Sequence, residues 1–419
     1  MPRINPAITQ WVSSFGQGVS TKALTVTNLV GGMNSVIMIL VGFTMILGVY
    51  IWYGIYRNTY ETPNNIKRIV EDRTKKAGHY DTDREKRIDL PKYLTELKNA
   101  GVPDTHLVFT NFHISTTNAT GIFLPGEDGV VSDYAARAAI AAGARGFVFD
   151  IWPDLSPSGN FSPILQIVES GSTWRRISLN SQPFVKILKM IMFEIFESGR
   201  TPNDVVVLYL RFRGKPRQQT FDGVVSALQA CIEPYRLDAS FSNCRGQKGD
   251  SNRLFSTFIT SLFKKVVVVS NELALGHGLN DYINIGPSEG IKLEWEYNEA
   301  KGLNEQTRRK AIVDIQQNLC FVAPLSEDSH TNKNDWNIED SMKIGIQYIA
   351  MNFFQSSDTL NDYLSPSKFG RSSYLMKPES IRYIPVFMTN PKSPQDPKWG
   401  SGPTAGTPTI PPAIQMPSN

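Results

Sequence analysis

Continuous apolar runs, bounded by polar or turn-forming residues, recur along the chain and predict its strands. They cover 107–115, 146–152, 163–169, 204–212, 265–271, 319–324, 347–354 and 373–377. Between them, apolar residues at helical spacing predict helices, for example at 132–143, 182–199 and 221–237. The strands are uniformly apolar rather than alternating, which is typical of strands covered on both faces. About eight β/α units predict a closed parallel (β/α)8 barrel, with a doubly wound sheet as the alternative.

A longer apolar stretch precedes this region. No charged residue lies between Lys22 and Arg57, and residues 33–56 exceed the roughly 20 apolar residues that a bilayer requires. Tyr50 and Trp52 lie near the end of the stretch, and aromatic rings prefer the headgroup layer of a membrane. The stretch predicts a single membrane-spanning helix, with a buried core helix as the alternative.

Basic residues determine the predicted orientation of that helix. Six follow it between positions 57 and 76, whereas only Lys22 precedes it at similar range. By the positive-inside rule, the large C-terminal part faces the cytosol or the equivalent side of a viral membrane. Two glycosylation sequons, at Asn118 and Asn160, are then expected to stay unmodified, and a glycan on either would reverse the orientation.

Composition and charge narrow the class of protein. With 41% hydrophobic and 11% aromatic residues, the 419-residue chain supports a sizeable core, which excludes wholesale disorder. A net charge of +4 gives no reason to expect nucleic-acid binding. Cys231, Cys244 and Cys320 are odd in number and lack CxxC spacing. They therefore argue against a disulfide scaffold or a zinc site and suit a reducing compartment.

The remaining segments flank the predicted barrel at 95–387. Residues 1–30 form either an interfacial amphipathic helix or an irregular segment. Residues 57–94 have the mixed-charge composition of a juxtamembrane connector. Residues 388–419 are rich in proline, which predicts an extended, disordered tail, either a spacer or a ligand for a partner domain.

Five segments resemble, in order, the phosphoinositide-specific phospholipase C family. They are HISTTNATGIF at 113–123, GARGFVFDIWPD at 143–154, PILQIVESGST at 163–173, DVVVLYLRF at 204–212 and the stretch 345–382, which contains QYIAMNFF and YLMKPE. The resemblance covers about residues 95 to 385. It implies a distorted (β/α)8 barrel of the phospholipase C-like phosphodiesterase type, with its active site at the carboxyl ends of the strands.

The resemblance also implies a chemistry. In the family, two histidines handle protons, and in the eukaryotic type an Asn, a Glu–Asp pair and a further Glu hold Ca²⁺. Carried over to this chain, the first histidine falls on Asn118 and the metal-binding Asn on Ala119. Strand two keeps Asp150, but its Glu partner is replaced by Val148.

The other two positions also depart from the family pattern. The second histidine falls at or near Glu169, and the strand-four Glu falls on Arg211. A carboxamide such as Asn118 has no proton to exchange near neutral pH, and Arg211 places a fixed positive charge where a cation should bind. The site is therefore expected to be degenerate and to need no cofactor. Asp150 would be a metal ligand only if a metal is bound, with Ca²⁺ the metal expected of an active enzyme.

Asp150 needs a partner, because an isolated buried carboxylate is costly. One hypothesis is that Arg211 pairs with it and takes the place of the lost ion. The alternative is that Arg211 points outward with Arg213, Lys215 and Arg217 as an exposed basic loop. These four residues are the candidate binding site for a phosphate or a phosphoinositide headgroup, and a solvated loop is the plainer alternative.

The histidines offer little to replace the missing catalytic pair. His113 is expected to be a core or rim residue, and His79 and His330 to be solvated. His277, between two glycines, is the only one in a loop that resembles a functional turn.

Three functions follow from these observations. The first is a membrane-anchored, catalytically degenerate phospholipase C-like protein that binds lipid or phosphate or has a structural role. The second is an active phosphoric diester hydrolase with a rearranged site. The third is a scaffold whose proline-rich tail recruits a protein partner.

Overall fold

The computed structural model covers the whole chain, which falls into two compact units, Met1–Ile69 and Val70–Asn419. The residues that the structure describes are 33–56, 68, 87–123, 129–156, 159–169, 175–176, 178, 180–198, 201–243, 246–247, 252–273, 278–287, 292–295, 299–300, 302–316, 321–322, 337–354 and 357–384. The predicted segment 1–30 and the proline-rich tail lie outside them.

The first unit contains helix α2, Met33–Tyr56, where the apolar stretch predicted a helix. Its side chains are described from Leu40 to Ile55, and they are largely exposed, including Phe43 at 71% and Trp52 at 65%. In the described part of the chain, no helix combines the length and hydropathy of a membrane span. The membrane crossing of α2 stays a prediction.

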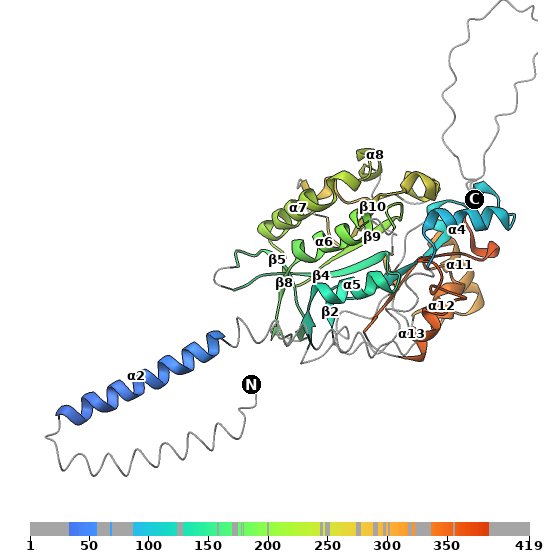
Figure 1. Ribbon diagram of the computed structural model, residues 1–419. Coiled ribbons are helices and arrows are strands. Elements are labelled where there is room, and N and C mark those ends of the chain that lie inside the picture. The colour runs from blue at the N-terminus through green and yellow to red at the C-terminus, as the bar shows by residue number, and fades with distance from the viewer. Residues whose placement is uncertain are drawn as a thin grey trace, which may run out of the picture. The chain divides into compact units, whose positions relative to one another are not determined.

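The second unit has a mixed α/β fold around one large sheet (Figure 1). Seven strands run parallel in the order β10-β9-β4-β1-β13-β12-β11. Their bounds are β1 Phe112–Thr117, β4 Gly146–Pro153, β9 Val206–Phe212, β10 Val266–Ser270, β11 Glu294–Trp295, β12 Phe321–Val322 and β13 Tyr348–Met351. Among the described residues, no pairing joins β10 to β11.

Two predicted barrel strands have a different role. The end of β4 pairs antiparallel with β5 (Pro163–Leu165), and β14 (Tyr374–Met376) pairs antiparallel with β1. Consequently β4 pairs directly with β9, from Gly146↔Val207 to Ile151↔Phe212, with no strand between them. The prediction that all eight runs join one parallel series was wrong at these two, because an apolar run reveals burial but not strand direction.

The remaining strands are short and lie outside the parallel series. They are β2 Ile122–Phe123, β3 Val130–Val131, β6 Val168–Glu169, β7 Arg175–Arg176 and β8 Gln182–Pro183. The helices are α4 Leu90–Asn99, α5 Asp133–Ala141, α6 Phe184–Met192, α7 Gln218–Ile232, α8 Ala239–Ser242, α9 Arg253–Ser256, α11 Glu305–Gln316, α12 Ile338–Lys343 and α13 Asp358–Tyr363, with one π-helical turn at Phe193–Glu197. Short 3₁₀ turns lie at Asp104–His106, Phe109–Asn111, Glu233–Tyr235, Ile259–Leu262, Gly278–Asp281 and Glu379–Ile381.

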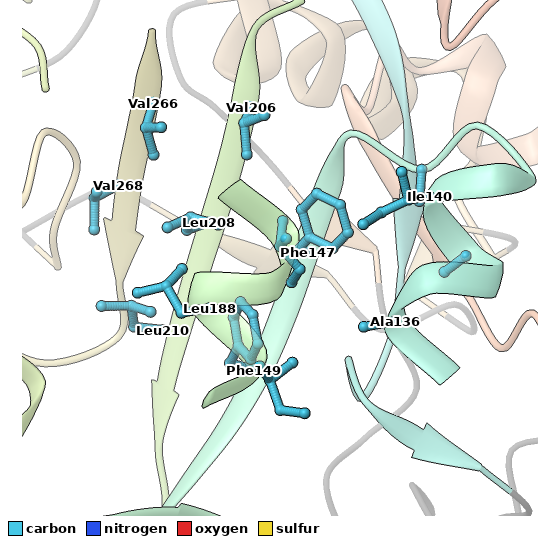
Figure 2. Close-up of a cluster of buried hydrophobic side chains, with 14 of the residues drawn as sticks. Ala136, Ile140, Phe147, Phe149, Leu188, Val206, Leu208, Leu210, Val266 and Val268 are labelled. Atoms are coloured by element: carbon cyan, nitrogen blue, oxygen red, sulfur yellow. The ribbon is translucent and has the colours of Figure 1, made fainter. Parts of the chain in front are cut away.

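Apolar residues pack on both faces of the sheet. On one face, strand residues such as Phe149 and Leu208 form one buried cluster with residues of α5 and α6, including Ala136 and Leu188 (Figure 2). On the other face, the rings of Tyr209 and Phe321 stack with their centroids 4.4 Å apart. Both residues belong to a second buried cluster, which further strand residues complete. Successive side chains of a strand alternate between faces. This alternation places Asp150 and Arg211 on the second face, beyond Val148 and Tyr209.

Helix α4 belongs to the compact unit. Asp89 caps its first turn by accepting from Lys92 N, and Leu90 and Leu94 are buried in the second cluster. Leu90 and Leu94 therefore belong to the folded body, although they lie within the segment 57–94 assigned to the connector.

Candidate functional site

The candidate site lies at the carboxyl ends of three adjacent parallel strands. Strands β1, β4 and β9 are neighbours, and Asp150 of β4 is the register partner of Arg211 of β9. Asn118 directly follows the last residue of β1. We call Asn118, Asp150, Tyr209, Arg211, Arg213 and Glu294 the strand-end site.

Arg211 is the centre of the strand-end site. Its side chain is fully buried, and its Nη2 donates to Asp150 Oδ2 at 2.9 Å and to Asn118 Oδ1 at 3.0 Å. Its Nη1 donates to Glu294 Oε1 at 2.8 Å. The predicted pairing of Asp150 with Arg211 is confirmed, and the alternative of an outward-pointing Arg211 is wrong. Two carboxylates and an amide oxygen surround one guanidinium, the arrangement that a buried cation requires.

The carboxylate of Asp150 joins two arginines, since its Oδ1 accepts from Arg213 Nε at 2.7 Å. Burial raises the pKa of Asp150, but Arg211 and Arg213 outweigh burial and leave that pKa below its ordinary value. Burial lowers the pKa of Arg211, whereas Asp150 and Glu294 raise it above the usual range. Asp150 and Arg211 therefore both stay charged at neutral pH.

Glu294 is a site residue that the sequence analysis missed. It lies in β11 and accepts from both Arg211 and, at 3.2 Å, the hydroxyl of Tyr209. Burial, with a contribution from Glu294, raises the pKa of Tyr209, so this phenol remains a donor. A two-residue strand leaves no periodicity to detect, and no other signal in the sequence marks Glu294.

The structure brings together only some of the positions to which the resemblance assigns catalytic or metal-binding residues. Asn118, Asp150 and Arg211 meet, and Val148 is fully buried beneath them on the same face of the sheet. Ala119 has a φ of 47°, a left-handed conformation that is uncommon for residues other than glycine. Glu169 ends β6, and its side chain lies outside the described residues.

The predicted basic binding residues divide into two groups. Arg211 and Arg213 are held by carboxylates, so they do not belong to a free basic loop. Lys215 is exposed, and the Arg217 guanidinium lies 4.1 Å from the centre of the Phe161 ring. In the salt bridges of the described residues, neither Lys215 nor Arg217 has a carboxylate partner. Gly214, with a φ of 68°, turns the chain between the two groups.

The residues present do not fit Ca²⁺. The guanidinium of Arg211 occupies the space between the oxygens of Asp150, Glu294 and Asn118, and its positive charge would repel a second cation there. Elsewhere in the described chain, no three His, Cys, Asp or Glu residues are grouped as metal ligands.

The two histidines that the structure describes lie away from this site. His113 is buried in β1, five residues before Asn118, and its Nδ1 donates to the carbonyl of Ile346 at 2.7 Å. Burial and the nearby Lys377 lower the pKa of His113 to about 3, although the Ile346 hydrogen bond raises it. His113 is thus a neutral core residue, as predicted. His106 is also buried, and the other three histidines lie outside the described residues.

Comparison with known proteins finds similarity in fold alone. No family model and no curated protein matches the chain. Its structure is similar to PLC21 of L. pealei, with 15% sequence identity and a TM-score of 0.47. It is also similar to PLC21 of S. officinalis, with 14% sequence identity and a TM-score of 0.49. Each of these matches covers 68% of this chain and 40% of the other chain. The phosphatidylinositol-specific phospholipase C of Listeria monocytogenes matches with 11% identity and a TM-score of 0.36, over 64% of this chain and 96% of that one. Because these TM-scores are below 0.5, nothing about function follows from these similarities.

Proposed function

We propose that this protein is a phospholipase C-like protein without phosphodiesterase activity that binds a lipid or phosphate group, or has a structural role, at a membrane. One observation carries the proposal. The buried Arg211 guanidinium is held between Asp150, Glu294 and Asn118, where the resemblance implies a catalytic cation.

Proton transfer also lacks a suitable group at this site. A general acid or base works best with a pKa near the operating pH. Asp150 has a lowered pKa, and each of its carboxylate oxygens accepts a hydrogen bond from an arginine. Tyr209 has a raised pKa, and Asn118 does not titrate. Asp150, Tyr209 and Asn118 are therefore poorly suited to move a proton near pH 7.

The proposal includes a membrane anchor and a closed barrel. Helix α2 exposes apolar side chains over its described length, which would be costly in water and favourable in a bilayer. The basic flank favours a single-pass protein whose C-terminal part faces the cytosol or the equivalent side of a viral membrane. Closure of the sheet between β10 and β11 belongs to the same proposal.

The activity is tested with the full chain in vesicles that contain phosphatidylinositol, with Ca²⁺ and with a chelator. We expect no release of inositol phosphate in either condition. Turnover that Asp150→Asn abolishes would contradict the proposal and establish the alternative, a phosphoric diester hydrolase with a rearranged site.

Glycosylation tests the proposed orientation, and the structure identifies the reporter residue. Asn160 is exposed, so the fold can accommodate a glycan there, whereas Asn118 is buried and bonded to Arg211. We expect no glycan on Asn160 after insertion into microsomes. The control is Val12→Asn, which makes an Asn-Ser-Ser sequon before α2 and should be modified. A glycan on Asn160 but not on the control sequon would reverse the orientation.

A further inference from the structure

The short segment 87–89, which leads from the connector into α4, is seated against the chain just before β14. Ile88 N donates to the carbonyl of Arg371 at 3.0 Å, and Ile88 forms a parallel bridge with Ser372. All three residues of the segment are half-buried. Backbone pairing therefore attaches the segment to the folded body before the first helix begins.

Arg87 holds this segment in place through its guanidinium. Its Nη1 donates to the carbonyl of Phe369 at 3.0 Å, and the guanidinium lies directly beside Gly143. A Cβ atom at Gly143 would overlap Arg87 Nη1, so the guanidinium fits only because this residue is glycine. The position of Arg87 thus depends on a single residue that is distant from it in the chain.

Leu90 provides a second attachment. Its N donates to Asp204 Oδ1 at 3.1 Å. Asp204 Oδ2 in turn pairs with Arg145 Nε at 2.6 Å, and both of these side chains are buried. Asp204 is a fixed point, because loss of either contact would leave a buried charge or donor without its partner.

Both attachments lie at the amino ends of β4 and β9. Gly143 and Arg145 come just before β4, and Asp204 comes just before β9. The strand-end site lies at the other end of the same two strands. Asp204 and Arg211 are seven residues apart, which is roughly 20 Å along a strand.

From this, we propose that residues 87–90 form an intramolecular strap, held by Arg87 beside Gly143. The strap fixes the point at which the chain enters the folded body, at the opposite end of the strands from the strand-end site. Its role as the end of a membrane tether rests on the proposed function, whereas the strap itself follows from contacts within the folded body.

Trypsin tests the strap, because it cleaves after arginine and its rate follows the fraction of molecules in which the bond has left its seat. The readout is the rate at which the full chain acquires an N-terminus at Ile88, measured by mass spectrometry. The decisive variant is Gly143→Ala, whose methyl group displaces the guanidinium but leaves the cleaved bond intact. We expect cleavage after Arg87 to be at least about tenfold faster than in the parent.

Gly345→Ala is the matched control. Both glycines follow the C-cap residue of a helix, and their φ angles are similar, 98° at Gly143 and 88° at Gly345. Alanine is therefore strained at both, but a Cβ at Gly345 would lie 3.6 Å from its nearest neighbour, an ordinary contact. The control should leave cleavage after Arg87 as it is in the parent.

If Gly143→Ala fails to fold, Arg87→Ala serves instead, with hydrogen exchange of the Ile88 amide as the readout. We expect this amide, which bonds to the Arg371 carbonyl, to exchange at least about tenfold faster than in the parent. Two results would overturn the inference. One is cleavage of the parent after Arg87 as fast as that of an isolated peptide of the same sequence, and the other is equal cleavage of the parent and Gly143→Ala.

The tether is tested separately, with the Gly143→Ala chain in phosphatidylcholine nanodiscs and size-exclusion chromatography after trypsin. Release of the fragment that begins at Ile88 supports a tether that ends at the strap. Retention of that fragment on the nanodiscs would refute the proposed single anchor and leave the strap standing. Equal cleavage of the parent and the variant would refute the strap and leave the proposed function standing.

Discussion

Replacing Arg211 with methionine is expected to destabilise the fold by about 3–5 kcal/mol, the usual cost of removing one partner from a buried ion pair. The guanidinium is fully buried and bonds three acceptors, so its loss leaves Asp150 and Glu294 without this counter-ion. Methionine fills similar volume and adds no charge, which attributes the loss to electrostatics rather than to a cavity.

Denaturant unfolding of the full chain measures this loss. The control is Arg371→Met, since the ion pair of Arg371 with Glu96 is largely exposed and should contribute about 0–1 kcal/mol. An equal loss from both substitutions would contradict the central role of Arg211.

A smaller replacement, Arg211→Ala, tests whether the guanidinium occupies a cation position, because methionine would fill the space that an ion needs. Without it, oxygens of Asp150, Glu294 and Asn118 face one space, and oxygen ligands of this kind suit Ca²⁺. We therefore expect CaCl₂ to raise the unfolding midpoint of Arg211→Ala and to leave that of the parent unchanged. A midpoint of the variant that is insensitive to Ca²⁺, compared with NaCl at equal ionic strength, would refute this interpretation.

A second large effect is expected on acidification, and it arises from His113. Its pKa is lowered to about 3 in the folded protein, against 6.5 as the ordinary value, so the unfolded chain takes up the proton first. The stabilising contribution of neutral His113 is complete above pH 6.5 and is lost as the pH falls towards 3. At pH 5, this one residue should lower the free energy of unfolding by about 2 kcal/mol relative to pH 8.

The measurement is the free energy of unfolding between pH 8 and pH 5, for the parent and for His113→Asn. The asparagine amide can donate to the Ile346 carbonyl as the imidazole Nδ1 does, but it does not titrate. Over this range, the variant should lose about 2 kcal/mol less than the parent. Parallel curves would show that His113 does not have the lowered pKa.

Much of the fold was accessible from the sequence, because burial leaves a direct mark on it. The runs that became β4, β9, β10 and β13 are apolar since both of their faces are covered. The same signal failed for 163–169 and 373–377, where the chain is equally apolar but the strands run antiparallel. Direction and neighbours depend on the whole path of the chain, which no local pattern records.

The strand-end site was likewise predictable from the sequence only in part. That Asp150 needs a cationic partner followed from the cost of an isolated buried carboxylate, and Arg211 was the substitution that could supply one. The availability of Arg213 was misjudged, because a run of basic residues has the composition of a solvated loop whichever direction each side chain takes.

The sequence by itself determined which groups this protein can use: an amide, an aliphatic residue and a guanidinium stand where the resemblance implies proton carriers and metal-binding acids. Only the tertiary structure decided how these groups are balanced, by bringing Glu294 of β11 to Arg211 of β9, 83 residues away in the chain. The physical reason is that charge balance in a buried site depends on distances across the sheet. Those distances are fixed by strand pairing and not by the order of residues along the chain.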